Sequence, residues 1–343
     1  MDNKAVLNEM LKGYCIKAVC EDVYSHNNFD IFYLKLLSGC KISALESVSR
    51  EIQLALKLDT PPVFVPDYKS GRLQLISAKK TKEKLDLKSV FKSKNVGSAL
   101  CQVGIDSTGN VLEIDLTEMP HMLVTGTTGS GKSVFLNILI ANIFAMRDDA
   151  ILYLVDPKQV EFSGYLWLTD TNIARIGYNL TSTSMLLDEV ENIMNKRYQW
   201  MSKHGYRSVK DFAPGVWKNI FVIIDEFSDL VLKDKKGEFT AQLCRIAAKS
   251  RAAGIHLIIA TQRASVNVVN GLIKANFPVR VVFKVASSIE SRIVIDMNGA
   301  ENLASRGDGL ISGYSDLPLT RFKSAFVDYE GVISYTNRLR VVA

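Results

Sequence analysis

Eight consecutive residues follow the order G-x-x-x-x-G-K-S of a phosphate-binding P-loop. An apolar run over residues 121–125 precedes them, and a helix-like segment begins at Lys132. Glycines let successive backbone N–H groups turn toward one anion. Lys132 is expected to reach the β- and γ-phosphates, and Ser133 to hold Mg²⁺. The loop predicts a site for a nucleoside triphosphate and consists of Gly126, Thr127, Thr128, Gly129, Ser130, Gly131, Lys132 and Ser133.

A second motif places two acids after another apolar run, residues 221–224. We expect Asp225 to complete the Mg²⁺ shell opposite Ser133. Glu226 is expected to activate the attacking water as a general base. Two acids at the end of a strand fit any α/β protein, but together with a P-loop they indicate ATP hydrolysis. An acid directly after the Mg²⁺-binding Asp is typical of ATP-hydrolysing motors.

Two further polar residues are candidates for the catalytic site. Gln262 follows the apolar run 255–260 and is expected to sense the γ-phosphate at the strand tip. Arg251 ends the helix-like segment 238–253, where it is either a favourable charge at a helix C-terminus or an arginine finger directed at a neighbouring copy's ATP. The second alternative requires an oligomer.

From about residue 116 onward, the pattern alternates between strands and helices. Short apolar runs of this kind suit a parallel sheet buried on both faces, and helices between them predict a doubly wound α/β domain over residues 116–343. The expected strands are residues 121–125, 150–155, 219–224, 255–260 and 280–285. The expected helices are residues 132–146, 184–204 and 238–253.

Residues 1–115 show a pattern of short strand-like and helix-like elements, which predicts a small α+β domain. Residues 29–37 alternate like a strand, and residues 43–58 place apolar side chains on one helical face. Residues 63–65 and 72–76 are expected to form a strand pair. Residues 106–110, DSTGN, predict a turn between two short strands.

Composition places the 343-residue chain among ordinary globular proteins, with 47% apolar and 23% charged residues. The longest apolar stretch is shorter than the roughly 20 residues of a membrane span, and no secretion signal is visible, so we expect a cytoplasmic protein. The five cysteines form no C-x-x-C pair and predict no zinc site. The net charge of +6 and the basic stretch 69–94 are compatible with a polyanion partner or with a solvated loop.

Beyond these motifs, the sequence resembles the motor region of the FtsK/SpoIIIE double-stranded DNA translocases, within the FtsK–HerA superfamily of P-loop ATPases. The resemblance runs from about residue 29 to residue 326 and is strongest over residues 119–310. The motifs that carry it are Met119-Pro120-His121, Val155-Asp156-Pro157-Lys158, Lys196-Arg197-Tyr198 with Met201 and Gly205, residues 250–263, residues 270–276, Ser291-Arg292 with Ile295-Asp296, and residues 299–303 with Gly307-Asp308-Gly309.

This resemblance implies a RecA-like ATPase domain that assembles into a hexameric ring around duplex DNA, with ATP sites between subunits. Arg251 would then complete the neighbouring site, and Lys158 would touch phosphate or the subunit contact. The resemblance also implies DNA contacts from basic side chains on pore loops. Such contacts bind phosphates and carry no sequence information. The candidate residues are Arg263, Lys274, Lys284 and Arg292.

The chain departs from the family pattern in several places. Ser288 stands where the family often has a lysine, although Lys284 is close in sequence, and residues 211–219 are brief where the family often has an insertion. Neither the family's DNA-reading domain nor its membrane anchor is visible, so loading or membrane docking would need a separate protein. We therefore expect a ring motor for transfer or packaging of a mobile element. The alternatives are a conjugative coupling protein and a slow ATP-gated DNA clamp.

Overall fold

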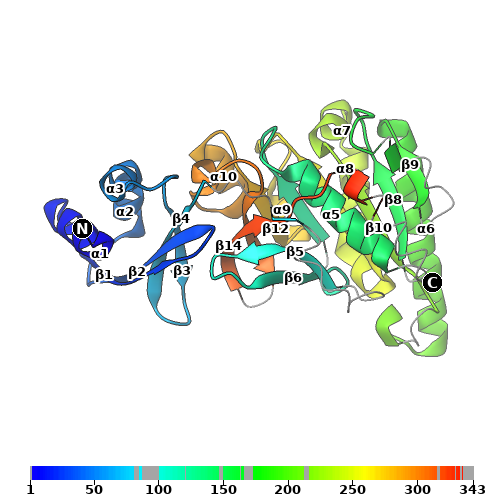
Figure 1. The fold of residues 1–343 in the computed structure, drawn as a ribbon. Helices are drawn as coiled ribbons and strands as arrows, with labels where there is room; N and C mark the ends of the chain where they lie inside the picture. The colour runs from blue at the N-terminus through cyan, green and yellow to red at the C-terminus, as the bar shows by residue number, and fades with distance from the viewer. Residues whose placement is uncertain are drawn as a thin grey trace.

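The computed structural model describes residues 2–80, 85–86, 100–119, 121–146, 150–162, 164–165, 173–211, 216–314, 317–328, 330–332 and 334. Its N-terminal unit is a four-stranded antiparallel sheet in the order β1-β2-β4-β3, with three short helices (Figure 1). The elements of this unit are α1 (Asn3–Gly13), β1 (Ala18–Ser25), β2 (Phe29–Leu36), α2 (Ile42–Ser47), α3 (Ser49–Leu56), β3 (Val63–Asp67) and β4 (Arg72–Ala78).

The N-terminal unit has its own apolar core, in which Leu7, Phe32, Ile52 and Leu75 are fully buried. Its strands confirm the predicted alternation and strand pair. The single helix expected over residues 43–58 is instead two helices, because the backbone leaves the helical conformation at Val48 (φ −107°, ψ 19°). Five of the nine basic residues in the stretch 69–94 lie outside the described residues.

The rest of the described chain forms a ten-stranded sheet with helices packed on it (Figure 1). Its strands are β5 (Leu100–Asp106), β6 (Val111–Asp115), β7 (His121–Thr125), β8 (Ala150–Val155), β9 (Ile173–Gly177), β10 (Asn219–Ile224), β11 (Ile255–Thr261), β12 (Val279–Phe283), β13 (Asp308–Tyr314) and β14 (Leu317–Ser324). Its helices are α5 (Lys132–Ala145), α6 (Leu180–His204), α7 (Phe227–Lys233), α8 (Glu238–Lys249), α9 (Gly271–Asn276) and α10 (Ser288–Ile295), with a 3-10 turn at Ser250–Ala253.

The five expected strands of the α/β region are confirmed, with ends that differ by at most two residues. The sheet order is β6-β5-β14-β13-β12-β7-β11-β10-β8-β9, and the part from β12 to β9 is parallel. Strand β11 lies between β7, which leads into the P-loop, and β10, which leads into the two acids. The parallel register brings the carboxyl ends of these strands to one edge of the sheet.

The two faces of the sheet are buried under different helices, as the unalternating strands predict. Along β10, Val222 belongs to an apolar cluster that includes residues of α6, α8, α9 and α10, whereas its neighbours Phe221 and Ile223 belong to a second cluster that includes residues of α5. Figure 1 shows α5 across the sheet and α6 beside β9 at the end away from the N-terminal unit. Among the described residues, no helix has the length and apolarity that crossing a bilayer requires.

Strands β5 and β6, expected in the N-terminal unit over residues 1–115, belong to the large sheet. Strand β5 pairs antiparallel with β14, with Gly104 opposite Ser324, and β6 pairs with β5 through the predicted turn. Sequence proximity does not decide which sheet a strand joins, because its hydrogen-bonding partner here comes from more than 200 residues later. We propose that the small unit ends near residue 80.

A buried ion pair links the large sheet to the N-terminal unit. The guanidinium of Arg321 on β14 donates to both carboxylate oxygens of Asp308, at 3.0 and 2.7 Å, and both side chains are fully buried. The same guanidinium donates to the carbonyl of Ile76 on β4. Because a buried charge is costly without partners, this cluster fixes how the two units meet.

Candidate active site

The P-loop connects β7 to α5, as the motif predicts. Gly129 and Gly131 have φ of 74° and 118°, which L side chains rarely adopt. A Cβ on Gly131 would lie 2.7 Å from the backbone nitrogen of Gly307, and one on Gly126 would lie 2.8 Å from Cβ of Phe283. The glycines therefore serve both the loop's turn and its close packing against the strands.

Backbone hydrogen bonds hold the loop in place from two sides. The N–H and the hydroxyl of Thr127 donate to the carbonyl of Lys284, at 2.9 and 3.0 Å. The N–H groups of Arg306 and Gly307 donate to the loop carbonyls of Gly129 and Ser130, at 3.2 and 2.7 Å. The loop thus donates to Lys284 on one side and accepts from Arg306 and Gly307 on the other, and these contacts fix its shape.

Lys132 at the start of α5 and Asp225 at the end of β10 form an ion pair. Both side chains are almost fully buried, with 3% and 2% of their surface exposed. Burial raises the pKa of Asp225, although Lys132 opposes this shift. The pair joins the P-loop to the acidic strand across β11.

The residues present fit a magnesium-bound triphosphate. Among the described residues, the buried hydroxyls of Thr125 and Ser130 have no hydrogen-bond partner, and both lie in or beside the loop. The oxygens of Ser133 and Asp225 are the donor type that Mg²⁺ prefers. The site therefore offers backbone amides and a lysine for phosphate and oxygens for the cation.

Glu226 adopts a left-handed backbone conformation (φ 50°) and is 2% exposed. Its Oε1 accepts hydrogen bonds from the Ser228 hydroxyl (2.6 Å), the Thr261 hydroxyl (2.9 Å) and the N–H of Gln262 (3.2 Å). Its Oε2 accepts from Lys158 Nζ at 3.1 Å. Burial alone would raise the pKa of Glu226, but these hydrogen bonds outweigh it and the pKa lies below its usual value. The carboxylate is thus held ionised beside Asp225.

Gln262 follows β11 directly, and its side chain lies against the P-loop. Its Oε1 accepts a hydrogen bond from the hydroxyl of Thr128 at 3.0 Å. Because its N–H also donates to Glu226, this residue contacts both the phosphate loop and the acidic strand. This position is consistent with a γ-phosphate sensor, which stays a prediction.

Arg251 lies at the opposite edge of the sheet, in the turn before the amino end of β11. The seven residues of that strand span about 20 Å, so the side chain lies far from its own P-loop. Its Nη2 donates to the carbonyl of Glu118 at 3.1 Å and lies 3.4 Å from the Glu118 carboxylate. Lys210 also pairs with Glu118 and holds the pKa of that carboxyl below its usual value.

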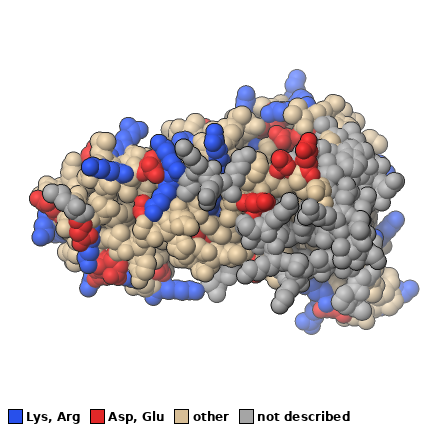
Figure 2. Space-filling model, viewed as in Figure 1, with Lys and Arg blue, Asp and Glu red and all other residues tan. Residues whose placement is uncertain are grey.

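The four candidate DNA contacts fall into two groups. Arg263 is exposed and follows Gln262, and Lys284 is half-buried beside the P-loop. Lys274 forms an ion pair with Asp296, and Arg292 donates to Asn298 at 2.6 Å. Basic and acidic side chains are interspersed over the N-terminal unit on the face shown in Figure 2. The role of these residues in DNA binding stays a prediction.

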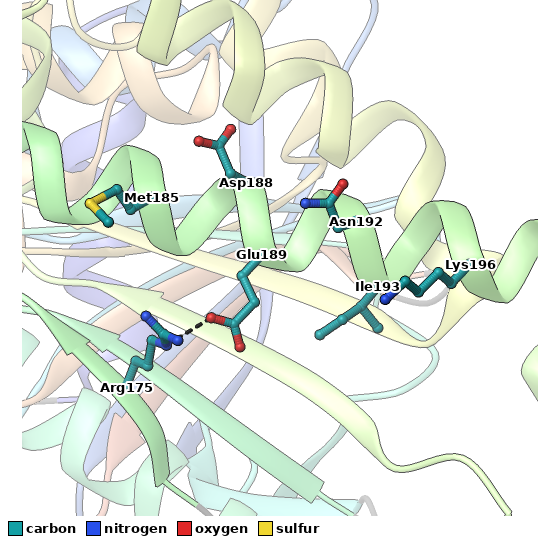
Figure 3. A pocket seen from close by; sticks show the side chains of 7 residues that line it. All are labelled: Arg175, Met185, Asp188, Glu189, Asn192, Ile193 and Lys196. Carbon is teal, nitrogen blue, oxygen red and sulfur yellow. Dashed lines mark ion pairs between the residues drawn. The ribbon is translucent and has the colours of Figure 1, made fainter.

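A groove of about 490 Å³ lies away from this site, between α6 and the edge strand β9. Figure 3 shows Arg175 of β9 directed at Glu189 of α6, with which it forms an ion pair at 2.7 Å. Glu189 also accepts a hydrogen bond from the Tyr153 hydroxyl at 2.9 Å. The carboxylate therefore fastens α6 to the end of the sheet.

Three features of the site escaped the sequence analysis. The hydroxyls of Ser228 and Thr261 have no motif of their own, because their role depends on where Glu226 is placed. The Arg306–Gly307 backbone contact has a weak signal in the nearby Gly-Asp-Gly triplet. The pairing of Lys158 with Glu226 was not expected from the sequence, and a contact of Lys158 with phosphate or a neighbouring subunit stays a prediction.

Comparisons with known proteins place this chain beside DNA translocases. The profile of the FtsK/SpoIIIE family matches residues 86–219 and 214–266. DNA translocase FtsK of Lactococcus lactis subsp. cremoris (strain MG1363) is 32% identical over 354 aligned positions, which cover 97% of this chain and 47% of that protein. DNA translocase FtsK of Haemophilus influenzae is 31% identical, with 99% of this chain and 71% of that protein covered. The chain thus spans about half the length of the Lactococcus relative.

Solved structures show the same fold. The pCW3 conjugation coupling protein TcpA, a monomer form with ATPgS, superposes over 100% of both chains with a TM-score of 0.68 and 23% identity. The cytoplasmic domain of the type VII secretion ATPase EccC from Thermomonospora curvata has a TM-score of 0.63 and 25% identity, covering 75% of this chain and 34% of that one. The RecA-like P-loop ATPase fold expected for the large sheet is confirmed.

Proposed function

The chain belongs to the FtsK/SpoIIIE family, and we propose that it is an ATP hydrolase that moves double-stranded DNA. The observation that carries this proposal is the convergence of Lys132, Asp225, Glu226 and Gln262 at one edge of the sheet. Such a mutually oriented group of polar side chains, of which Lys132, Asp225 and Glu226 are buried, suits phosphoryl transfer, where positioning and electrostatic stabilisation dominate.

The chemistry assigns one task to each of these residues. The P-loop amides and Lys132 would bind the β- and γ-phosphates, and Ser133 and Asp225 would hold Mg²⁺, which neutralises phosphate charge when bound. Glu226 would take the proton of the attacking water. Gln262 would orient the γ-phosphate from the loop side.

The position of Arg251 supports a ring. It is 56% exposed at the edge opposite its own P-loop, and a cation there can complete a site only in another copy of the chain. A hexamer around duplex DNA is the assembly that the family resemblance implies. DNA phosphates would be contacted by Arg263, Lys274, Lys284 and Arg292, with an affinity that falls steeply with salt.

The experiment that tests this function measures ATP turnover by the purified chain with and without linear duplex DNA, followed by displacement of a triplex-forming strand. We expect strong stimulation by duplex and ATP-dependent displacement. Glu226→Gln is the control, which should bind ATP without turning it over. Turnover indifferent to duplex would contradict the proposal, and turnover without displacement would favour a DNA-binding clamp.

A more specific candidate is delivery of a mobile element's DNA, as a coupling protein or a packaging motor. It is favoured by the superposition with the pCW3 coupling protein over the full length of both chains. The test is transfer or packaging of a marked element in cells that carry the Lys132→Ala variant. Undiminished transfer would contradict this candidate while leaving the translocase proposal intact.

A further inference from the structure

The two oxygens of the Glu226 carboxylate have neighbours of different kinds. Oε1 accepts three hydrogen bonds, from Ser228 on α7, from Thr261 at the end of β11 and from the next backbone N–H. Ser228 and Thr261 are fully buried. Oε2 accepts from Lys158, whose side chain is 43% exposed. One oxygen is therefore held by fixed parts of the fold, and the other by a side chain that reaches solvent.

The turn that carries Lys158 is itself fixed. Asp156, fully buried after β8, accepts the N–H of Lys158 at 3.2 Å and the N–H of Phe162 at 2.8 Å. Strand β8 pairs directly with β10, with Val155 opposite Ile224. The backbone of Lys158 is therefore anchored next to the acidic strand, and its side chain crosses to Glu226. This arrangement differs from an ordinary surface ion pair, in which both side chains are free to move.

A general base needs an oxygen lone pair that can accept a proton from water. Oε1 already accepts three hydrogen bonds, so Oε2 is the oxygen left for water. The ammonium of Lys158 occupies that oxygen in the structure. The positive charge of Lys158 stabilises the ionised carboxylate and makes Oε2 a weaker proton acceptor, so the intact ion pair opposes proton transfer from water.

We propose that Lys158 is a positioning residue that holds Glu226 in a resting arrangement, and that hydrolysis requires Lys158 Nζ to leave Oε2. This inference rests on the proposed ATPase function. In a DNA-stimulated cycle, engagement of duplex is the step that frees Oε2. Slow turnover without DNA then follows from the ion pair.

The test compares Lys158→Met with the wild-type chain in steady-state ATP turnover. Without DNA, we expect kcat to rise by about tenfold, the scale of losing one charge-assisted hydrogen bond, while KM for ATP stays unchanged. With saturating duplex, kcat should equal that of the wild type, so the stimulation ratio falls by the same factor. A misfolded or weakened enzyme would not gain activity.

Two further variants serve as controls. Lys158→Arg keeps a cation at Oε2 and should retain the low basal kcat. Lys233→Met removes an exposed lysine from the end of α7 and should leave both rates unchanged. A basal kcat of Lys158→Met at or below the wild-type value overturns the proposal. Should Lys158→Met fold poorly, Lys158→Gln keeps a donor without the charge and is expected to raise basal kcat in the same direction.

The failure of the proposed function is distinguishable from the failure of this inference. A wild-type chain without ATP turnover contradicts the function itself. In that case, a double-mutant cycle on the melting temperature, with Lys158→Met and Glu226→Gln, still tests the pair. We expect the two shifts to be non-additive, and additive shifts would overturn the role of Lys158.

Discussion

The carboxyl and amino edges of the large sheet handle charge in opposite ways. At the carboxyl edge, Lys132, Asp225 and Glu226 are 2–3% exposed, and each is bound to a charged partner from another part of the fold. At the amino edge, Arg251 and Glu118 are 56% and 57% exposed. Buried charges must be paired and oriented, whereas exposed ones exchange partners at little cost. The first edge is built to hold reacting groups, and the second to present a cation to another surface.

The largest effect is expected from Lys132→Ala. It removes the phosphate-binding cation and leaves Asp225 buried without its partner. We expect nucleotide binding and ATP turnover to fall below detection, measured with a fluorescent ATP analogue and a phosphate-release assay. Circular dichroism checks that the variant is folded. Nucleotide binding at the wild-type affinity would contradict the assignment of the P-loop to the nucleotide site.

Arg251→Ala tests the exposed edge. If the side chain completes a neighbour's site, kcat falls by about 10³-fold, the lower end of the range for arginine fingers, while ATP binding is unchanged. Mixing Arg251→Ala with Lys132→Ala should restore part of the turnover, because each copy supplies what the other lacks. A wild-type rate in pure Arg251→Ala would show that the cation serves no other copy.

A pH experiment examines a buried group at the amino edge. His121 accepts the N–H of Leu257 at Nδ1 and lies 2.8 Å from the carbonyl of Ala247 through Nε2, which fixes a neutral ring. Burial lowers its pKa from 6.5 to about 3. The unfolded chain therefore binds this proton first, so stability is present above pH 6.5 and is lost as pH falls toward 3.

The expected loss from His121 between pH 7 and pH 5 is about 2 kcal/mol of unfolding free energy. It is measured by urea unfolding of the wild type against His121→Gln, which keeps one donor and one acceptor. The variant should lose less stability over this interval. Equal losses in both proteins would mean that His121 does not carry the pH dependence.

The smallest effect is expected from Glu118→Gln. It breaks the ion pairs with Lys210 and Arg251, but all three side chains are at least 43% exposed. The unfolding free energy should change by less than about 1 kcal/mol, and Arg251 should stay available to a neighbour. A large fall in melting temperature would mean that this edge is as tightly built as the other.

The sequence predicts much of the carboxyl edge, because each part is local. A P-loop, an acidic strand end and Gln262 after an apolar run can each be recognised within about ten residues. The partners of individual side chains are harder to predict from the sequence. The contacts of Glu226 with Lys158 and Thr261 depend on strand order, and the pairing of Lys274 with Asp296 depends on how α9 meets the residue after α10. That β5 and β6 belong to the large sheet could not be predicted for the same reason, because it too depends on strand order.

The backbone contact between Gly307 and the P-loop has a mechanical consequence. The N–H of Gly307 donates to the carbonyl of Ser130. Asp308, which follows Gly307, pairs with Arg321, and Arg321 donates to the carbonyl of Ile76 in the sheet of the N-terminal unit. The central pair of this path, Asp308 and Arg321, is fully buried. Rotating the N-terminal unit against the large sheet at this point would separate two desolvated ions, which is costly. A movement of the P-loop is therefore transmitted to the N-terminal unit.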